Sequence, residues 1–307
     1  MINKIFSKKE KEKHILYRAI DYAYKMLHFL SQKQKFFILG LFNNHYRWEY
    51  EIRHKKFSYE EIFELFRSQA LYPKNILSVE DTINYIVDNN CSISRLGDGE
   101  EFLFNMLNDN PTFPELKQKL LDICANGTTS NCLVCINNFN ADNENCPDFY
   151  RKHFTHYYSK IVSSDKIKKI KFSKNIYGDA YALQFFSEIS AEKDVINEKI
   201  KSIWNKRKVL FVINKYSAII NDTDCFTNVE SKDYYYIPKE NAYSKYNQIF
   251  EDIISKYDNS YLVYIEGGAM ASVLSYELSK QGYTALDMGG YYKKNYGSKK
   301  EECNNDR

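Results

Sequence analysis

Two acidic residues, Asp98 and Glu100, stand two positions apart in the segment Gly-Asp-Gly-Glu, directly after a short alternating run. Residues at positions i and i+2 of an extended segment point to the same side of the chain, so both carboxylates can reach one point in space. Carboxylate oxygens suit hard divalent cations such as Mg²⁺ and Mn²⁺. The spacing therefore fits a metal site on Asp98 and Glu100, and it also fits a polar turn without a chemical role.

The residues before these two acids predict the element that would position them. Residues 91–96 alternate and carry β-branched side chains, which predicts a short strand. Gly97 and Gly99 would end this strand, because glycine adopts backbone conformations that other residues resist. Ligands of α/β proteins usually bind at the carboxyl ends of strands, where the two acids would then lie. Arg95 could neutralise a phosphate there or pair with one of the carboxylates.

Buried-strand patterns and helical patterns alternate along the following part of the chain. Further strands are predicted over residues 132–136, 209–213, 234–237, 261–265 and 284–288. Helices are predicted to begin near residues 78, 114, 188, 241 and 268. Ser78 and Asp81 form an approximate capping box at the first of these helices. The alternation predicts an α/β fold with a Rossmann-like, mostly parallel sheet flanked by helices.

The first 75 residues are predicted to form a helical N-terminal extension. Apolar residues recur there at helical spacing and give one stripe, which packs on a core, on a membrane surface or on a partner. Five lysines among the first 14 residues are compatible with a peripheral contact to anionic lipid. The boundaries that follow are an extension over residues 1–75, a main domain over 76–292 and a charged, disordered tail over 293–307.

Composition narrows the classes of protein and the location that we expect. The net charge of +3 over 307 residues does not call for a nucleic-acid partner. No apolar run reaches the length of about 18 residues needed to span a membrane, and the N-terminus has no apolar signal core. We therefore expect a cytoplasmic chain, with any membrane contact at the inner face. Cys132 and Cys135 lie inside an apolar run, so two buried thiols are expected rather than zinc ligands.

Three segments resemble the GT-D-type glycosyltransferases. Residues 92–100, Ser-Ile-Ser-Arg-Leu-Gly-Asp-Gly-Glu, are similar to the signature of that family. Residues 237–246 contain Pro-x-x-Asn-Ala-Tyr-x-x-Tyr. Residues 262–289 show a strand pattern, a small-residue turn and a helical pattern, and end in Gly-Tyr-Thr-Ala-Leu-Asp-Met-Gly. Both stretches resemble family segments. The three segments occur in the family's order over roughly residues 78–290, which is more specific than a single motif.

The resemblance implies a metal-dependent glycosyltransferase. Asp98 and Glu100 would be the catalytic metal ligands, holding Mn²⁺ or Mg²⁺ against the diphosphate of a nucleotide-sugar donor. Arg95 would add positive charge or orient the two acids, and Gly97 would belong to the same substrate-binding segment. The implied acceptor is a surface glycan or the sugar chain of a glycoprotein.

Four further residues are candidates for the same site. Gly267 and Gly268 join a predicted strand to a predicted helix, an arrangement that offers backbone N–H groups to an anion. Asn241 either caps the helix that it opens or hydrogen-bonds a ligand. Asp287 is a candidate general base because it ends a predicted strand, and the alternative is a structural hydrogen bond.

The sequence departs from the family pattern, and three of the departures keep other functions open. The usual Arg is missing from residues 175–181, the usual glycines are missing from 214–224, and Gly290 stands where the family has a His. A metal-dependent phosphoester hydrolase would use the same two acids. A non-catalytic scaffold of a glycan-assembly complex would use neither and would bind its partner through the N-terminal extension.

Overall fold

A computed structural model describes residues 73–97, 112–136, 170–183, 193–221, 225–292 and 296. All of them belong to one compact unit of the chain, made of residues 71–147 and 170–307. The predicted N-terminal extension and C-terminal tail lie outside the described residues, apart from residues 73–75 and 296. The domain boundaries therefore stay predictions.

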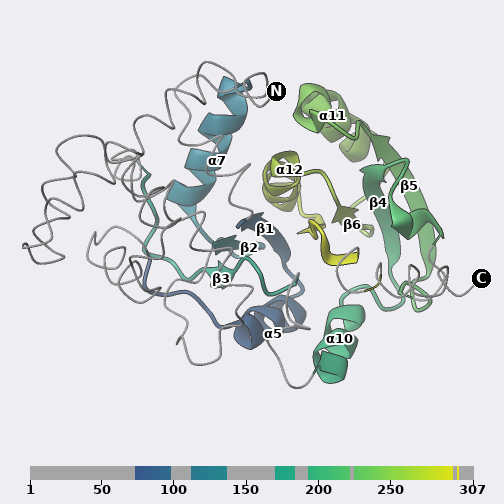
Figure 1. Cartoon of the computed structure of the whole chain (residues 1–307), viewed down its shortest axis with the longest axis horizontal. Helices are drawn as coiled ribbons and strands as arrows, with labels where there is room; N and C mark the ends of the chain where they lie inside the picture. The colour runs from purple at the N-terminus through teal and green to yellow at the C-terminus, as the bar shows by residue number, and fades with distance from the viewer. Residues whose placement is uncertain are drawn as a thin grey trace, which may run out of the picture. The chain divides into compact units, whose positions relative to one another are not determined.

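Seven strands of the described part form one parallel sheet in the order β3-β2-β1-β7-β6-β4-β5 (Figure 1). The strands are β1 (Ser92–Leu96), β2 (Cys132–Ile136), β3 (Gly178–Asp179), β4 (Lys208–Asn214), β5 (Ser231–Ile237), β6 (Leu262–Ile265) and β7 (Thr284–Asp287). Each of the pairings between neighbouring strands is parallel. The prediction of an α/β fold with a Rossmann-like sheet is confirmed.

Helices cover both faces of this sheet (Figure 1). They are α5 (Val79–Asn89), α7 (Pro114–Asn126), α10 (Lys193–Ser202), α11 (Tyr246–Lys256) and α12 (Ala269–Lys280), with short 3-10 turns η3 (Ala218–Asn221) and η4 (Ala242–Lys245). Helix α12 packs on β1 and β7 beside α7 and α11, whereas α5 and α10 pack on each other. No helix in this described part is long and apolar enough to cross a membrane.

Alternation along β1 assigns its side chains to these two faces. Ile93 joins the core cluster that contains residues of α5 and α10, and Ser94 points to α12, where its hydroxyl donates to the Ser272 carbonyl at 2.8 Å. Ser92 donates to the Tyr283 carbonyl at 3.0 Å and accepts from the Ala285 N–H at 2.9 Å. A parallel strand buried on both faces usually reads as a continuous apolar run. The serines are tolerated here because each one satisfies a backbone group of the neighbouring elements.

The helix starts follow the local signals of the sequence. The Ser78 hydroxyl accepts from the Asp81 N–H at 3.0 Å, which confirms Ser78 as the N-cap of α5. The Asp81 carboxylate accepts from the Ser78 hydroxyl at 2.7 Å, whereas in a full capping box it would accept from the Ser78 N–H. Pro114 occupies the first turn of α7, where its missing N–H removes no helical hydrogen bond. Cys132 and Cys135 are fully buried free thiols of β2, as two packed cysteines should be.

Candidate active site

The carboxyl ends of the central strands meet at one edge of the sheet. The register pairs Leu96 with Ile136 and Ile265 with Asp287, so the segments that follow β1, β2, β6 and β7 leave the sheet at neighbouring points. From β1 the chain moves outward through β2 to β3, while β7 lies on its other side. Such a reversal of strand order is the place where open α/β sheets bind ligands.

Asp98 and Glu100 lie outside the described residues. Gly97, which directly precedes Asp98 in the sequence, is buried just after the end of β1. The convergence of the two acids on one cation, and the choice of Mn²⁺ or Mg²⁺, stay predictions. Within the described ranges, no group of three His, Cys, Asp or Glu side chains could hold a metal ion.

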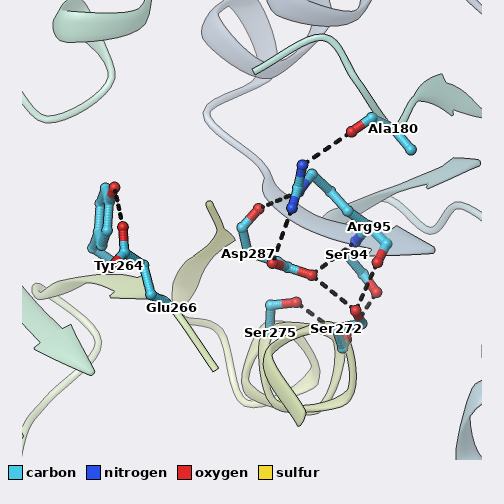
Figure 2. A network of polar contacts seen from close by, with 8 residues as sticks. All are labelled: Ser94, Arg95, Ala180, Tyr264, Glu266, Ser272, Ser275 and Asp287. Carbon is cyan, nitrogen blue, oxygen red and sulfur yellow. Dashed lines mark hydrogen bonds and ion pairs between the residues drawn. The ribbon is translucent and has the colours of Figure 1, made fainter. Parts of the chain in front are cut away.

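Arg95 is buried at the end of β1 and pairs with Asp287 at the end of β7 (Figure 2). Its Nη2 lies 3.7 Å from Asp287 Oδ1, its Nε donates to the Asp287 carbonyl at 2.8 Å, and its Nη1 donates to the Ala180 carbonyl at 3.0 Å. The side chain thereby ties β1 to β7 and to the segment after β3. Burying a guanidinium is costly unless it is paired and hydrogen-bonded, and Arg95 meets both conditions.

Asp287 is surrounded by hydrogen-bond donors. Its Oδ2 accepts from the Ser272 hydroxyl at 2.8 Å and from the Arg95 backbone N–H at 3.3 Å, and the residue is only 3% exposed. The Ser272 hydroxyl also lies 2.6 Å from the Arg95 carbonyl, so its single proton serves one of these two acceptors at a time. This geometry favours a structural role for Asp287 over the role of general base. The general-base role of Asp287 stays a prediction.

The segment after β3 fixes the end of β1 from the other side. The Tyr181 hydroxyl donates to the Gly97 carbonyl at 3.0 Å, and the Ala180 carbonyl accepts from Arg95. Asp179 supports this segment by accepting from the Tyr181 N–H at 2.8 Å. The residue that leads into the predicted metal motif is thus held by contacts that the sequence patterns did not indicate.

Gly267 and Gly268 form the tight turn between β6 and α12 that the sequence predicted. Gly268 has φ +56° and ψ −145°, a conformation that L side chains rarely adopt. A Cβ on Gly267 would lie 2.6 Å from Met270 Cε and 3.2 Å from Ile237 Cδ1. The turn directs the N-terminal end of α12 to the carboxyl edge, an orientation that favours an anion. Contact of either glycine with substrate stays a prediction.

Asn241 lies apart from the Arg95–Asp287 pair. It precedes η4, which packs against α12, and it adopts the left-handed conformation with φ 53°. Asparagine tolerates this conformation better than most residues. Its side chain is exposed and makes no capping hydrogen bond, so capping does not explain the residue. The ligand-binding alternative stays a prediction.

Two acids that the sequence analysis did not single out, Asp179 and Glu266, stand at the carboxyl edge. Asp179 ends β3 and is 5% exposed, and burial raises its pKa to about 7 against the single hydrogen bond from Tyr181. Glu266 follows β6, and burial raises its pKa to about 7 although hydrogen bonds from Ser217 and Tyr264 oppose the shift. The available signal was their position, since each acid directly ends or follows a strand of an α/β pattern.

Comparison with known proteins places the chain among glycosyltransferases. A family model described as Glycosyltransferase GT-D fold matches residues 93–304. "Glycosyltransferase GlyD" of Streptococcus pneumoniae is 29% identical over 226 residues, covering 70% of this chain and 26% of that protein. "Probable glycosyl transferase Gly" of Streptococcus gordonii is 24% identical, covering 70% of this chain and 32% of that protein. This chain therefore spans about a quarter to a third of the length of these relatives.

Solved structures share the fold. A new glycosyltransferase from Streptococcus sanguinis superposes with a TM-score of 0.62 at 24% identity, covering 74% of this chain and 85% of that one. A domain of unknown function described as having a distinct glycosyltransferase fold gives a TM-score of 0.63 at 21% identity, covering 78% of this chain and 86% of that one. With a family model matched over most of its length and the sheet described above, this chain belongs to the GT-D-fold glycosyltransferase family.

Proposed function

We propose that this chain transfers a sugar from a nucleotide-diphosphate sugar to a glycan or glycoprotein acceptor, with Mn²⁺ or Mg²⁺ held by Asp98 and Glu100. The observation that supports this most directly is the buried Arg95–Asp287 pair, which fixes the end of β1 three residues before the first acid. A set of two carboxylates fits a hard divalent cation. When bound, the cation would neutralise charge on the diphosphate and stabilise the leaving nucleotide.

Arg95 acts in this scheme as a positioning residue. Its Nε and Nη1 donate to backbone carbonyls and its Nη2 faces the Asp287 carboxylate, so the guanidinium is directed into the protein. It holds the strand end that precedes the two acids in the sequence, which is the second of the two roles left open by the sequence. Charge complementarity for the diphosphate then comes from the acids' cation and from the N-terminal end of α12.

Turnover with a panel of nucleotide sugars tests the proposal. Product formation should require Mn²⁺ or Mg²⁺ and an acceptor, and Asp98→Ala should abolish it. Asp88→Ala, an exposed acid of α5, is the matched control and should leave the rate unchanged. Release of free sugar phosphate without an acceptor would support the hydrolase instead. No turnover together with tight binding of a partner would support the scaffold.

The surroundings of the reaction follow from the same proposal. We place the enzyme in the cytoplasm, where nucleotide sugars would reach it, with the basic N-terminal residues at the inner membrane face. No nucleic-acid partner is proposed, because the net charge is only +3. Co-sedimentation with anionic vesicles, with and without residues 1–14, tests the membrane contact.

A further inference from the structure

Glu266 directly follows β6 and extends its pairing by one residue at the carboxyl ends of the strands. Its N–H donates to the Val212 carbonyl of β4 at 3.0 Å, so the chain still runs beside β4 at this point. Tyr264, two residues earlier, is fully buried in the core cluster on the face that α10 covers. Because alternate residues of a strand share a face, Glu266 extends the same face to the rim of the sheet.

Two neutral hydroxyl groups hold the Glu266 carboxylate. The Ser217 hydroxyl donates to Oε2 at 3.1 Å and the Tyr264 hydroxyl donates to Oε1 at 3.3 Å, as Figure 2 shows for Tyr264. Neither donor carries a charge, and within the described ranges no Lys, Arg or His forms an ion pair with Glu266. Burial raises the pKa of Tyr264 well above its usual value, with the Glu266 charge adding to the effect, so Tyr264 stays a neutral donor.

A partly buried carboxylate without a positively charged partner lowers the stability of the fold. A residue that lowers stability in this way is a candidate for a functional role. The same burial raises the pKa of Glu266 to about 7, where a carboxyl group exchanges its proton readily at neutral pH. Such perturbed acids in clefts are candidates for proton transfer. Cys225 and Tyr291 also lie near the Tyr264 hydroxyl, and burial raises the pKa of Tyr291 well above its usual value, so Tyr291 adds no charge here.

Two exposed tyrosines lie at the same carboxyl ends of the strands. Tyr236 of β5 is 54% exposed and pairs with Ile213 of β4, which is next to Glu266 across the sheet. At about 4.8 Å between strands, Tyr236 and Glu266 are separated by roughly 10 Å. Tyr236 stacks on Tyr234 with ring centroids 6.2 Å apart, which holds its ring in place. Tyr216, 71% exposed, directly precedes the Ser217 that contacts Glu266.

We propose that Glu266 is the general base of the transfer and that Tyr216 and Tyr236 flank the subsite for the acceptor sugar. This inference rests on the proposed function and adds to it the residue that handles the proton. An exposed tyrosine offers an apolar ring and a hydroxyl, which suits the mixed surface of a sugar. Only β7 separates β6 from β1, so Glu266 stands roughly 10 Å from the end of β1, the strand that precedes Asp98 and Glu100 in the sequence. That separation leaves room for the donor sugar between the diphosphate and the base.

The step is a direct displacement. The acceptor hydroxyl gives its proton to the Glu266 carboxylate, and its oxygen forms a bond to the anomeric carbon of the donor. The bond between that carbon and the phosphate oxygen breaks, and its electron pair leaves with the nucleoside diphosphate. The Ser217 and Tyr264 hydroxyls hold the carboxylate in place without neutralising it.

Glu266→Gln tests the base, with donor binding measured separately from transfer. General-base loss should lower kcat by roughly 10²–10⁴-fold, while the affinity for the nucleotide sugar and Mn²⁺ stays within twofold. The wild-type rate should fall as pH drops below about 7, and this limb should vanish in the variant. Glu266→Asp should retain the limb at reduced rate. Transfer by Glu266→Gln at the wild-type rate with an unchanged pH profile would overturn the inference.

Tyr236→Ala tests the acceptor subsite, with Tyr236→Phe as the matched control that keeps the ring. The alanine variant should raise the KM for the acceptor several-fold and leave the KM for the donor unchanged, and the phenylalanine variant should resemble wild type. An unchanged acceptor KM in the alanine variant would overturn this part. If wild type transfers no sugar from any donor, the proposed function itself fails and takes the base with it, an outcome distinct from an active enzyme indifferent to Glu266.

Discussion

Asp287→Asn separates a structural carboxylate from a catalytic one. The substitution keeps the size of the side chain and an oxygen that can accept from Ser272, but it removes the negative charge that lies 3.7 Å from the buried Arg95 guanidinium. The two side chains are only 6% and 4% exposed, so water cannot replace the lost interaction. Removing one partner of a buried pair costs about 3–5 kcal/mol. Because the amide retains one hydrogen bond, we expect about 3 kcal/mol.

Urea denaturation and thermal melting, both followed by tryptophan fluorescence, measure this loss. For a unit of this size, Tm falls by roughly 2–4 °C per kcal/mol, so Asp287→Asn should melt about 6–12 °C below wild type. Asp88→Asn, an exposed acid of α5, is the control and should stay within about 0.5 kcal/mol of wild type. Combining Asp287→Asn with Arg95→Met should cost less than the sum of the two single changes, because the pair is then removed together.

The opposite pattern would refute the reasoning. If Asp287→Asn unfolds within 1 kcal/mol of wild type, a threshold well below the cost of breaking a buried pair, and yet loses all transfer activity, Asp287 is the general base and Arg95 does not depend on it. A double-mutant coupling energy near zero would point the same way, because it would show that the 3.7 Å pair does not contribute to folding.

Three other outcomes follow from the structure. Gly268→Ala should destabilise by about 1–3 kcal/mol in a melting experiment, because φ +56° with ψ −145° is strained for a residue with a Cβ. Ser78→Ala should cost about 1 kcal/mol by removing the cap of α5, an effect visible as a lower urea midpoint. Stability should fall as pH rises from about 4.5 to about 7, since the folded-state pKa of Glu266 is raised and its protonated form is the stabilising one. The free energies of unfolding from urea titrations at pH 5 and pH 8 should therefore differ less for Glu266→Gln than for wild type, by up to about 3 kcal/mol.

The sheet was predictable because its strands carry strong local signals. Residues of β4 and β6 are continuous apolar runs between polar turns, and the structure extends the predicted 209–213 only to Lys208–Asn214. The β5 prediction was shorter than the element, 234–237 against Ser231–Ile237, because Ser231, Lys232 and Asp233 have low strand propensity. They pair with the buried β4, and this tertiary pairing overrides their own preference.

The site was less predictable, because its decisive contacts join residues far apart in the chain. Arg95 and Asp287 were both singled out, but nothing in the sequence indicates that they pair, because that contact depends on β1 lying beside β7. Glu266 was hidden by its context, since an acid before two glycines is typical of an ordinary turn. Its partner Ser217 stands 49 residues earlier and reaches it only because β4 is the neighbour of β6.

Helix α12 connects the two halves of the candidate site. Its N-terminal turn begins at Gly268, beside Glu266, and one turn later Ser272 contacts Arg95 and Asp287. Ser94 of β1 donates to the Ser272 carbonyl, so the helix is fixed to the strand that leads to Asp98 and Glu100. A shift of α12 on binding a diphosphate would therefore move the end of β1 as well. The end of β1 and the turn that follows Glu266 are therefore both fixed to the same helix, so a substitution in the first turn of α12 should perturb both.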